Sequence, residues 1–556
     1  MAAGLVAWRK CDIVAAPMPL RRALDARRAG QERTDAVADI VLINPRFDTS
    51  FWGMEYALPF LGRRANMPVA ALPLLAALTP AEHSITLIDE NVEAIDFERC
   101  ARADIVGVTG MTVQRRRMRE ILTELKRRGI FTAVGGPFVS VAEDYFTGLA
   151  DVIFIGEAEE TWPQFLADRR DGKAATRYEQ AQASDMARVP APRLDLLKMD
   201  RYAYANVQFS RGCPFLCEFC DIIVVFGRRP RIKTARQIIV ELEALLAQDH
   251  STVFIVDDNL IGNKKAIKEV LRELIAWQAA NGYPITFVTE ASLDLADDEE
   301  LMRLMVEANI IAVFVGIESP NTDALRETRK LQNVREGGSM VDKVRRVQEA
   351  GMEVWAGMIL GFDSDDETIF DAHRRFIASA RINMAMVGML SAIPKTPLYA
   401  RLKSAGRLDP TDHPVLGTNV LPLQMSRQTL SDGYVRLVAD LYEPQAYFQR
   451  VDDLYVTGNI EIDRAWQRYA ARHPWRRLMR HGWFWLEAFF ILGRLLWSIP
   501  DRSLRALYGR RFLRFLRFRR NATAARVYAQ KCAVHYHMHQ MVRTLQARDR
   551  PLLNTF

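Results

Sequence analysis

The amino-acid sequence predicts an α/β protein with two consecutive series of strands and helices, followed by a mostly helical C-terminal region. Short apolar runs alternate with helical stretches in residues 39–165, and the same alternation begins again at residue 203 and continues to residue 395. Strands that alternate with helices form parallel sheets. The first series predicts a doubly wound, Rossmann-like domain, and the second predicts a partial (β/α)6 barrel.

The composition is typical of a globular protein with several domains. The chain has 556 residues, with 49% hydrophobic and 26% charged residues. Six cysteines, three of them close together, argue against a disulfide framework and for a reducing compartment. Residues 1–38, an N-terminal extension, lack the pattern of a signal peptide, and no stretch of about 18 apolar residues is free of charge. We therefore expect a cytoplasmic protein without a membrane-spanning helix.

The first series contains five expected strands. They are residues 39–45, 84–89, 104–109, 131–136 and 151–156, with helices that include residues 67–78 and 113–128. In a doubly wound sheet, ligands bind at the carboxyl ends of the strands. The turns expected there contain Thr109, Gly110, Gly135, Gly136, Gly156 and Glu157. Glycines let a large planar or phosphate-bearing ligand approach the backbone, although a strand-end glycine often serves only the turn.

A linker is expected between the two series. Residues 166–202 lose the periodicity, and prolines interrupt residues 187–193.

The second series contains six expected strands. They are residues 205–209, 253–256, 285–289, 312–316, 353–360 and 385–390, separated by helices at about 235–247, 264–281, 297–308, 340–351 and 366–380. Such a barrel carries its site at the carboxyl ends of its strands.

Three cysteines follow the first strand of this second series. Cys213, Cys217 and Cys220 have C-x3-C-x2-C spacing, and Gly212 precedes them. A four-iron cluster normally takes four thiolates, so three local cysteines predict an iron–sulfur cluster with one iron open to a substrate or cofactor. The alternatives are a zinc site or three buried thiols. Zinc sites favour four ligands, usually with a second C-x2-C pair or histidine partners, and no second pair is present.

Acidic residues recur at the ends of the later strands. They are Asp257, Asp258, Glu290, Glu318 and Asp363, and the polar residues Asn259, Ser292 and Ser319 accompany them. Taken singly, each could be a helix N-cap or a loop acid. Together, at one mouth of a barrel, they predict a site for a polar, cationic small molecule.

The cysteine loop at the mouth of a six-unit βα barrel resembles the radical S-adenosylmethionine (SAM) superfamily. The resemblance implies a [4Fe–4S] cluster on Cys213, Cys217 and Cys220, whose open iron binds SAM, and a radical that abstracts hydrogen from an unactivated carbon. It also implies contacts to SAM from Phe219, Asp257, Asp258, Glu290 and Glu318. The sequence has Asp-Asp-Asn where the family has Gly-Gly-Glu.

The upstream domain resembles the cobalamin-binding domain of cobalamin-dependent radical SAM enzymes. The resemblance rests on Asn44-Pro45, Thr109, Gly135-Gly136 and the run Gly156-Glu-Ala-Glu. It implies that cobalamin is held by Thr109, Gly110, Gly135, Gly136, Gly156 and Glu157. The Asp-x-His-x-x-Gly loop of other cobalamin proteins is absent, so we expect cobalt without a histidine ligand from the loop after the first strand.

The similarity extends over about residues 39–455, in the manner of the subgroup that contains the hopanoid 2-methylases and the bacteriochlorophyllide ring methylases. It implies a methyltransferase that acts on an unactivated carbon of a hydrophobic, hopanoid-like or tetrapyrrole substrate, with a reducing partner such as flavodoxin or ferredoxin. Two alternatives stay open. One is a radical SAM oxidase, cyclase or mutase that uses cobalamin without methyl transfer, and the other is a cobalamin-binding sensor with a structural cluster.

The C-terminal part divides into a helical extension, residues 396–470, and a basic amphipathic region, residues 471–556. Residues 471–520 hold thirteen arginines, no lysine and two acids, among many aromatic and aliphatic residues. This pattern predicts contact with an anionic membrane surface through residues 475–520, on the inner face of the membrane. The alternatives are packing onto the barrel and binding of nucleic acid, for which no accompanying module is present.

Three histidines stand at alternate positions near the C-terminus. His535, His537 and His539 would not all share one face of a helix, so we expect them at the surface rather than on a metal ion.

Overall fold

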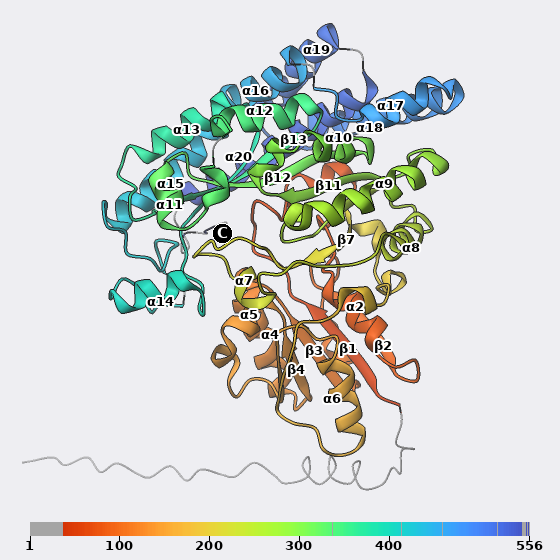
Figure 1. Cartoon of the computed structure of the whole chain (residues 1–556), viewed down its shortest axis with the longest axis vertical. Coiled ribbons are helices and arrows are strands. Elements are labelled where there is room, and N and C mark those ends of the chain that lie inside the picture. The colour runs from red at the N-terminus through yellow and green to blue at the C-terminus, as the bar shows by residue number, and fades with distance from the viewer. Residues whose placement is uncertain are drawn as a thin grey trace, which may run out of the picture.

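The computed structural model describes residues 37–335, 337–412, 414–458, 460–519 and 521–547, together with Leu552 and Asn554. The first of the two parallel sheets lies at the lower end of Figure 1, and the barrel and the C-terminal helices lie at the upper end. The α/β fold class with a helical C-terminal region is therefore confirmed. The expected N-terminal extension falls almost wholly outside the described residues.

The first sheet has six parallel strands in the order β2-β1-β3-β4-β5-β6. This order is that of a flavodoxin-like doubly wound sheet, which binds ligands where the strand order reverses, between β1 and β3. The strands are β1 (Asp39–Asn44), β2 (Ser84–Asp89), β3 (Ile105–Thr109), β4 (Thr132–Gly135), β5 (Val152–Ile155) and β6 (Arg177–Glu179).

Helices cover both faces of this sheet. Along β1, Ile40 and Leu42 pack into one apolar cluster, while Val41 and Ile43 pack into another. The helices are α2 (Ala71–Leu78), α3 (Phe97–Cys100), α4 (Arg115–Arg127), α5 (Pro137–Val141) and α6 (Thr161–Arg170), with 3-10 turns at η1 (Leu58–Leu61), η2 (Thr112–Gln114) and η3 (Glu143–Phe146).

Strand β6 differs from the sequence prediction, which placed residues 166–202 in a linker. β6 pairs in parallel with β5 at the edge of the sheet. Only its central residue, Tyr178, is buried, while Arg177 and Glu179 face solvent. A three-residue strand with one buried side chain leaves no periodic signal, so sequence patterning could not reveal it. Irregular chain with 3-10 turns η4 (Met186–Arg188), η5 (Leu194–Leu196) and η6 (Met199–Arg201) follows.

The second sheet is an open barrel of six parallel strands in the order β14-β13-β12-β11-β10-β7. β14 and β7 form its two edges. The strands are β7 (Ala205–Val207), β10 (Thr252–Ile255), β11 (Thr286–Ala291), β12 (Ile310–Glu318), β13 (Glu353–Leu360) and β14 (Met384–Met389).

Helices cover the outside of the barrel (Figure 1). The main ones are α8 (Ala235–Leu246), α9 (Lys264–Asn281), α10 (Glu299–Glu307), α12 (Met340–Ala350) and α13 (Ile369–Ser379). Shorter helices are α7 (Ile222–Val225), α11 (Thr322–Glu327), η7 (Leu260–Asn263), η8 (Leu293–Asp297) and η9 (Leu331–Asn333). The expected six βα units are confirmed.

The first barrel strand is shorter than expected. It ends at Val207, and the chain then forms a two-residue strand, β8 (Ser210–Arg211), which pairs antiparallel with β9 (Arg231–Ile232). This small ribbon brackets the cysteine loop, so it fixes both ends of the loop against each other.

The C-terminal region consists of helices that pack on the barrel. They are α14 (Pro397–Ser404), α15 (Arg427–Leu441), α16 (Pro444–Asp452), the π-helical turn η10 (Asp453–Thr457), α17 (Arg464–Ala471), α18 (Pro474–Ser498), α19 (Arg502–Phe518) and α20 (Ala522–Ala547). One apolar core includes barrel strands together with buried residues of α18, α19 and α20. Within the described residues, no helix is both long and apolar enough to cross a bilayer.

The surface prediction for the histidines of α20 is wrong for two of them. His535 and His537 are fully buried, because α20 lies inside the molecule rather than on it. His535 Nδ1 lies 2.7 Å from the Tyr508 hydroxyl, and His537 Nε2 lies 2.9 Å from the Ser50 carbonyl. Burial lowers the pKa of His535 to about 3 and that of His537 to about 4, so both are neutral.

Candidate active site

A cavity of about 2230 Å³ lies between the carboxyl edge of the first sheet and the mouth of the barrel. Its walls include Gly110 and Gly136 of the first domain and Cys220, Asp258 and Glu290 of the barrel. A single small-molecule site usually has about 300–1,000 Å³. The cavity is therefore large enough to hold more than one ligand.

The cysteine loop connects β8 to β9. Gly212 has φ +94°, and a Cβ there would lie 3.0 Å from the carbonyl oxygens of Gly227 and Arg229, so only glycine fits this turn without strain. Cys213 N donates to the Gly227 carbonyl over 3.2 Å. Burial raises the pKa of the Cys213 and Cys220 thiols, which means that the thiolates need a compensating positive group such as iron.

Two aspartates hold the chain that leads into this loop. Asp257 accepts hydrogen bonds from Phe209 N (2.7 Å) and Ser210 Oγ (2.6 Å), and Asp258 accepts from Gly212 N (2.7 Å). Burial raises the pKa of Asp257 to about 7 and that of Asp258 to about 6. Asp258 lines the cavity, whereas both oxygens of Asp257 are engaged inside the protein. In this structure Asp257 holds the chain before the cysteine loop, and its predicted contact with SAM stays a prediction.

Glu290 is the penultimate residue of β11 and lines the cavity. Burial and the nearby carboxylates of Asp258 and Asp257 raise the pKa of Glu290 to about 8. Ionised carboxylates in such a poorly solvated place are costly unless a cation joins them. Asp258 and Glu290 therefore form an acidic wall that favours a positively charged ligand.

Glu318 is placed differently from Glu290. Its backbone has φ +65° at a register shift in β12, and its buried carboxylate accepts from Lys330 Nζ over 2.7 Å. Burial would lower the pKa of Lys330, but Glu318 and the thiols of Cys217 and Cys220 outweigh burial and raise it. Lys330, which carries a positive charge beside the cysteine loop, is not among the residues predicted from the sequence.

Two amides lie near the thiols, one from Asn259 at the expected barrel mouth and one from Gln332, which was not predicted. Asn259 Nδ2 is 4.0 Å from Cys213 Sγ, and Gln332 Nε2 is 3.6 Å from Cys217 Sγ. Amide donors at such distances stabilise negative charge on sulfur.

Phe219 lies between Cys217 and Cys220 in the loop and lines the cavity. Its ring centroid lies 6.2 Å from that of Phe362, at the edge of a small apolar cluster. Its predicted place beside the adenine of SAM stays a prediction.

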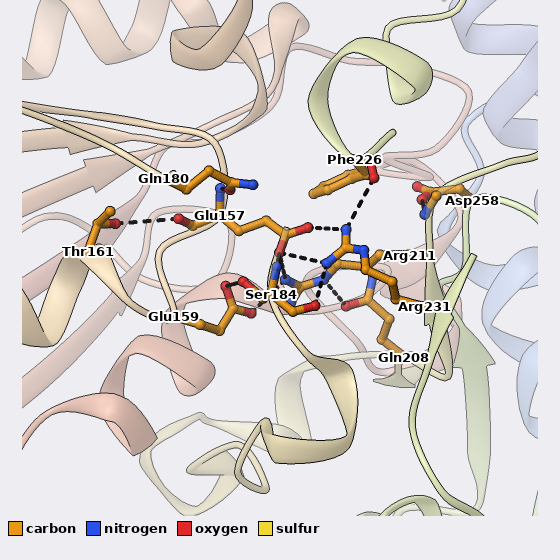
Figure 2. A network of polar contacts seen from close by, with 11 residues as sticks. Glu157, Glu159, Thr161, Gln180, Ser184, Gln208, Arg211, Phe226, Arg231 and Asp258 are labelled. Carbon is orange, nitrogen blue, oxygen red and sulfur yellow. Dashed lines mark hydrogen bonds and ion pairs between the residues drawn. The ribbon is translucent and has the colours of Figure 1, made fainter. Parts of the chain in front are cut away.

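A network of ion pairs joins the first domain to the cysteine loop (Figure 2). Glu157, after β5, accepts from both terminal nitrogens of Arg231 and from Ser184 N, and Glu159 lies 2.5 Å from Arg211. The side chain of Glu157 is fully buried. Burial would raise the pKa of Glu157, but the arginines hold it below its usual range.

This network has a structural consequence for the cysteine loop. Arg211 and Arg231 belong to β8 and β9, the two strands that bracket the loop. The carboxylate of Glu157, predicted to bind cobalamin, is thus engaged in fixing the first domain against the loop, although the residue also lines the cavity. Arg231 was missed because nothing in the local sequence marks a partner 74 residues away.

The other predicted cobalamin contacts sit at the sheet edge as expected. Thr109, Gly110, Gly135, Gly136 and Gly156 all line the cavity. Gly136 has φ +108°, and a Cβ there would lie 2.4 Å from Thr109 Oγ1. The ends of β3 and β4 can approach each other this closely only with glycine at position 136. The requirement for glycine is therefore explained by the turn, without a ligand.

The loop after β1 reaches into the barrel. The ring centroid of Trp52 lies 5.0 Å from that of Phe314 and 6.1 Å from that of Phe254, which come from β12 and β10. All three rings line the cavity. Among the described residues that line it, none is a histidine. Sequence patterning gave no sign that this loop supplies an aromatic wall to the other domain.

Family models match three parts of the chain. Residues 64–166 match the B12 binding domain, residues 207–376 match the radical SAM superfamily, and residues 396–550 match a domain of unknown function. The chain is 40% identical over 415 residues to an uncharacterized methyltransferase from Synechocystis sp., covering 74% of this chain and 77% of that one.

The chain belongs to the cobalamin-dependent radical SAM methyltransferases.

A second relative is the hopanoid C-2 methylase from Rhodopseudomonas palustris. It is 34% identical over 419 residues, which cover 74% of this enzyme and 78% of the relative. The structure of the radical SAM methyltransferase TsrM from Kitasatospora setae, with cobalamin and a [4Fe–4S] cluster bound, is similar with a TM-score of 0.54. The alignment covers 72% of this enzyme and 82% of TsrM at 16% identity, and it shows a shared fold.

The cofactors of the enzyme are therefore a [4Fe–4S] cluster, SAM and cobalamin. The residues present fit the cluster. Among the described residues, no three His, Cys, Asp or Glu side chains are arranged around one metal ion. A four-iron cluster takes each thiolate on a different iron, so Cys213, Cys217 and Cys220 need not converge on one point.

Proposed function

We propose that the enzyme transfers a methyl group from SAM, by way of cobalamin, to an unactivated carbon of a hydrophobic acceptor. The observation that carries this proposal is the single cavity, which is lined by the cysteine loop, by Asp258 and Glu290, and by the glycine turns of the first sheet. When bound, the cluster with SAM supplies radical chemistry and cobalamin supplies a methyl carrier. Both have to reach the same carbon, so one shared cavity is required.

The residues of the barrel mouth divide the work of binding. Cys213, Cys217 and Cys220 hold the cluster. Asp258 and Glu290 attract the positively charged end of SAM, and Phe219 packs against its adenine. Asp257 positions the loop through Phe209 and Ser210.

Glu318 acts on the ligand indirectly, through Lys330. It holds the ammonium of Lys330 next to the thiols, where a positive charge stabilises the anionic cluster and suits the carboxylate of SAM.

The turns of the first sheet hold cobalamin. Thr109, Gly110, Gly135, Gly136 and Gly156 present backbone and small side chains to the cavity, which leaves room for a wide, flat ligand. Glu157 holds this edge of the sheet in position against the cysteine loop through its ion pair with Arg231.

The acceptor is hydrophobic. Trp52, Phe254, Phe314 and Met386 contribute apolar side chains to the cavity wall. A hopanoid-like or tetrapyrrole acceptor suits such a wall, and the relative from Rhodopseudomonas palustris is named as a hopanoid methylase.

Product analysis tests the proposal. The reconstituted enzyme, given SAM, a one-electron reductant and a lipid and pigment extract, should form S-adenosylhomocysteine and 5′-deoxyadenosine together. Formation of 5′-deoxyadenosine without S-adenosylhomocysteine would instead favour a radical reaction without methyl transfer. Absence of both would favour a cobalamin-binding sensor.

The electron comes from an acidic one-electron carrier such as flavodoxin or ferredoxin. Leu216 of the cysteine loop and Leu331 are exposed. The exposed Arg228 donates to the Pro214 carbonyl of the same loop over 3.3 Å, and the exposed guanidinium of Arg335 lies 6.0 Å from the ring centroid of Phe215. Arg229 is exposed as well. Opposite charge steers such carriers, so we expect SAM cleavage driven by flavodoxin to slow as salt rises, unlike cleavage driven by dithionite.

The enzyme works in the cytoplasm, in contact with the inner face of the membrane through residues 475–520. A hydrophobic acceptor supports this location, because such a molecule partitions into lipid.

A further inference from the structure

Helix α18 has two apolar faces, of which only one is covered by the described part of the chain. Phe484, Ala488, Ile491 and Leu495 are buried, and the helix packs on α20 through this inner face. A surface helix of a globular protein normally turns a polar face outward.

The outward face of α18 is instead aromatic and aliphatic. Six residues on it, Trp475, Met479, Trp483, Leu486, Phe490 and Trp497, are between 55% and 88% exposed. We call these six residues the outer stripe. Their spacing of three, four or seven residues keeps them on one side of the helix, opposite the inner face. Exposed aromatic residues in one continuous stripe mark an interaction surface rather than ordinary surface variation.

Positive charge accompanies the outer stripe. Arg476 and Arg477 are exposed at its N-terminal end, and the guanidinium of Arg494 lies 5.3 Å from the ring centroid of Phe490. The acid on the helix, Glu487, is paired with Arg526 at 3.4 Å and accepts from Trp483 Nε1. The net charge beside the stripe is therefore positive, which favours an anionic partner.

We propose that the outer stripe of α18 docks on an anionic lipid bilayer, with the helix lying in the plane of the interface. Tryptophan and phenylalanine enter the headgroup region, and arginines meet lipid phosphates. A second copy of the chain fits less well. A two-fold contact through the same stripe would bring the arginines of one copy close to those of the other.

Docking would also bring the cavity close to lipid. α18 packs on α20, and Met541 and Leu545 near the end of α20 line the cavity. The cavity wall is thus one helix away from the docked surface. Docking assigns the membrane contact proposed for residues 475–520 to one face of α18, and delivery of the acceptor from the bilayer rests in addition on the proposed methyl transfer.

Vesicle flotation of the full chain tests the proposal. We expect the enzyme to float with vesicles of phosphatidylglycerol and phosphatidylcholine in equal parts, more weakly at high salt, and less with phosphatidylcholine alone. A variant with Trp483→Gln, Leu486→Gln, Phe490→Gln and Trp497→Gln should lose on the order of tenfold or more of its vesicle binding, because four large apolar groups no longer enter lipid.

The matched control carries Val415→Gln and Leu423→Gln. These side chains are 71% and 59% exposed and belong to the segment between α14 and α15, outside the outer stripe, so the control should float like the wild type. Vesicle-free formation of 5′-deoxyadenosine should be unchanged in both variants, since none of these residues lines the cavity. That readout separates a failure of docking from a failure of the proposed function.

Several outcomes would overturn the proposal. Equal flotation of the stripe variant and the wild type would place lipid contact elsewhere. A dimer in light scattering that the stripe variant loses, without flotation of the wild type, would assign the stripe to a second copy. Flotation that occurs only after residues 1–36 are removed would indicate that this segment, and not lipid, occupies the outer stripe in the full chain. Absence of both flotation and dimers would leave the stripe without lipid contact and contradict docking.

Discussion

The two parallel sheets of this enzyme face one cavity with different chemistry. The barrel mouth contributes thiols and carboxylates, namely Cys220, Asp258 and Glu290, whereas the edge of the first sheet contributes small residues such as Gly110 and Gly136. Both follow the rule that parallel sheets bind ligands at the carboxyl ends of their strands. Both edges lie at the carboxyl ends of parallel strands, but the barrel mouth offers charged groups and thiols to the cavity, whereas the first sheet offers backbone and small side chains.

The largest effect should come from removing a thiol on the barrel side. Cys213→Ala should abolish cluster assembly and SAM cleavage, because a cluster needs its thiolates, yet cobalamin binding on the sheet side should persist. Iron content, 5′-deoxyadenosine formation and cobalamin retention check this. Cys100→Ala, at a buried thiol of the first domain, is the control and should keep all three. Undiminished SAM cleavage by Cys213→Ala would contradict the assignment.

A smaller loss is expected at the acidic wall. Glu290→Gln should weaken SAM binding between about tenfold and a hundredfold, as expected for loss of a charged partner in a poorly solvated site. In the wild type, SAM affinity should rise as the pH increases through about 8, because Glu290 must lose its proton to attract a cation.

Equilibrium binding of SAM across this pH range checks both expectations. Glu290→Gln should show no rise near pH 8, and Glu349→Gln, at an exposed site, should behave as the wild type. A pH profile that is the same in Glu290→Gln and the wild type would show that another group controls binding.

The ion pair between Glu157 and Arg231, which joins the first domain to the cysteine loop, should affect both the stability of the enzyme and the ratio of its two products. Glu157→Gln leaves Arg231 without its buried charged partner and should lower the free energy of unfolding by about 3 kcal/mol. It should also lower the yield of S-adenosylhomocysteine relative to 5′-deoxyadenosine, because the first sheet is less firmly held against the cysteine loop. Denaturant unfolding and product ratios check this.

The control for that change is Glu179→Gln. Glu179 forms an exposed ion pair with Arg177 and should contribute less than about 1 kcal/mol. Equal stability of the two variants would mean that the network in Figure 2 does not hold the domains together.

The smallest expected change is spectroscopic and concerns the sheet side. Since no described residue lining the cavity is a histidine, the visible spectrum of the cobalamin-loaded enzyme should lack the signature of histidine-ligated cobalt. A histidine-ligated spectrum would contradict the expectation from the loop after β1.

Local patterning predicted the strands and the cysteine loop because both are encoded by neighbouring residues. The run 39–45 and the spacing of Cys213, Cys217 and Cys220 are examples. Long-range pairing has no local signal, so the Glu157–Arg231 and Glu318–Lys330 pairs were not predictable.

The burial of helix α20, which carries polar and charged residues, also could not be predicted from the sequence. His535 lies in the core because α20 is surrounded by α18, α19 and the barrel, an arrangement that depends on packing far along the chain. For α18 the amphipathic pattern was visible, but the structure was needed to tell the inner face from the outer stripe.

The central claim is that the two sides act on one acceptor in one cavity. We would give the reconstituted enzyme SAM that carries a trideuterated methyl group, together with a lipid and pigment extract from a strain that lacks the gene. We expect an extract component in which one hydrogen atom is replaced by a trideuterated methyl group, with equal amounts of S-adenosylhomocysteine and 5′-deoxyadenosine. Abundant 5′-deoxyadenosine without a labelled component and without S-adenosylhomocysteine would contradict it.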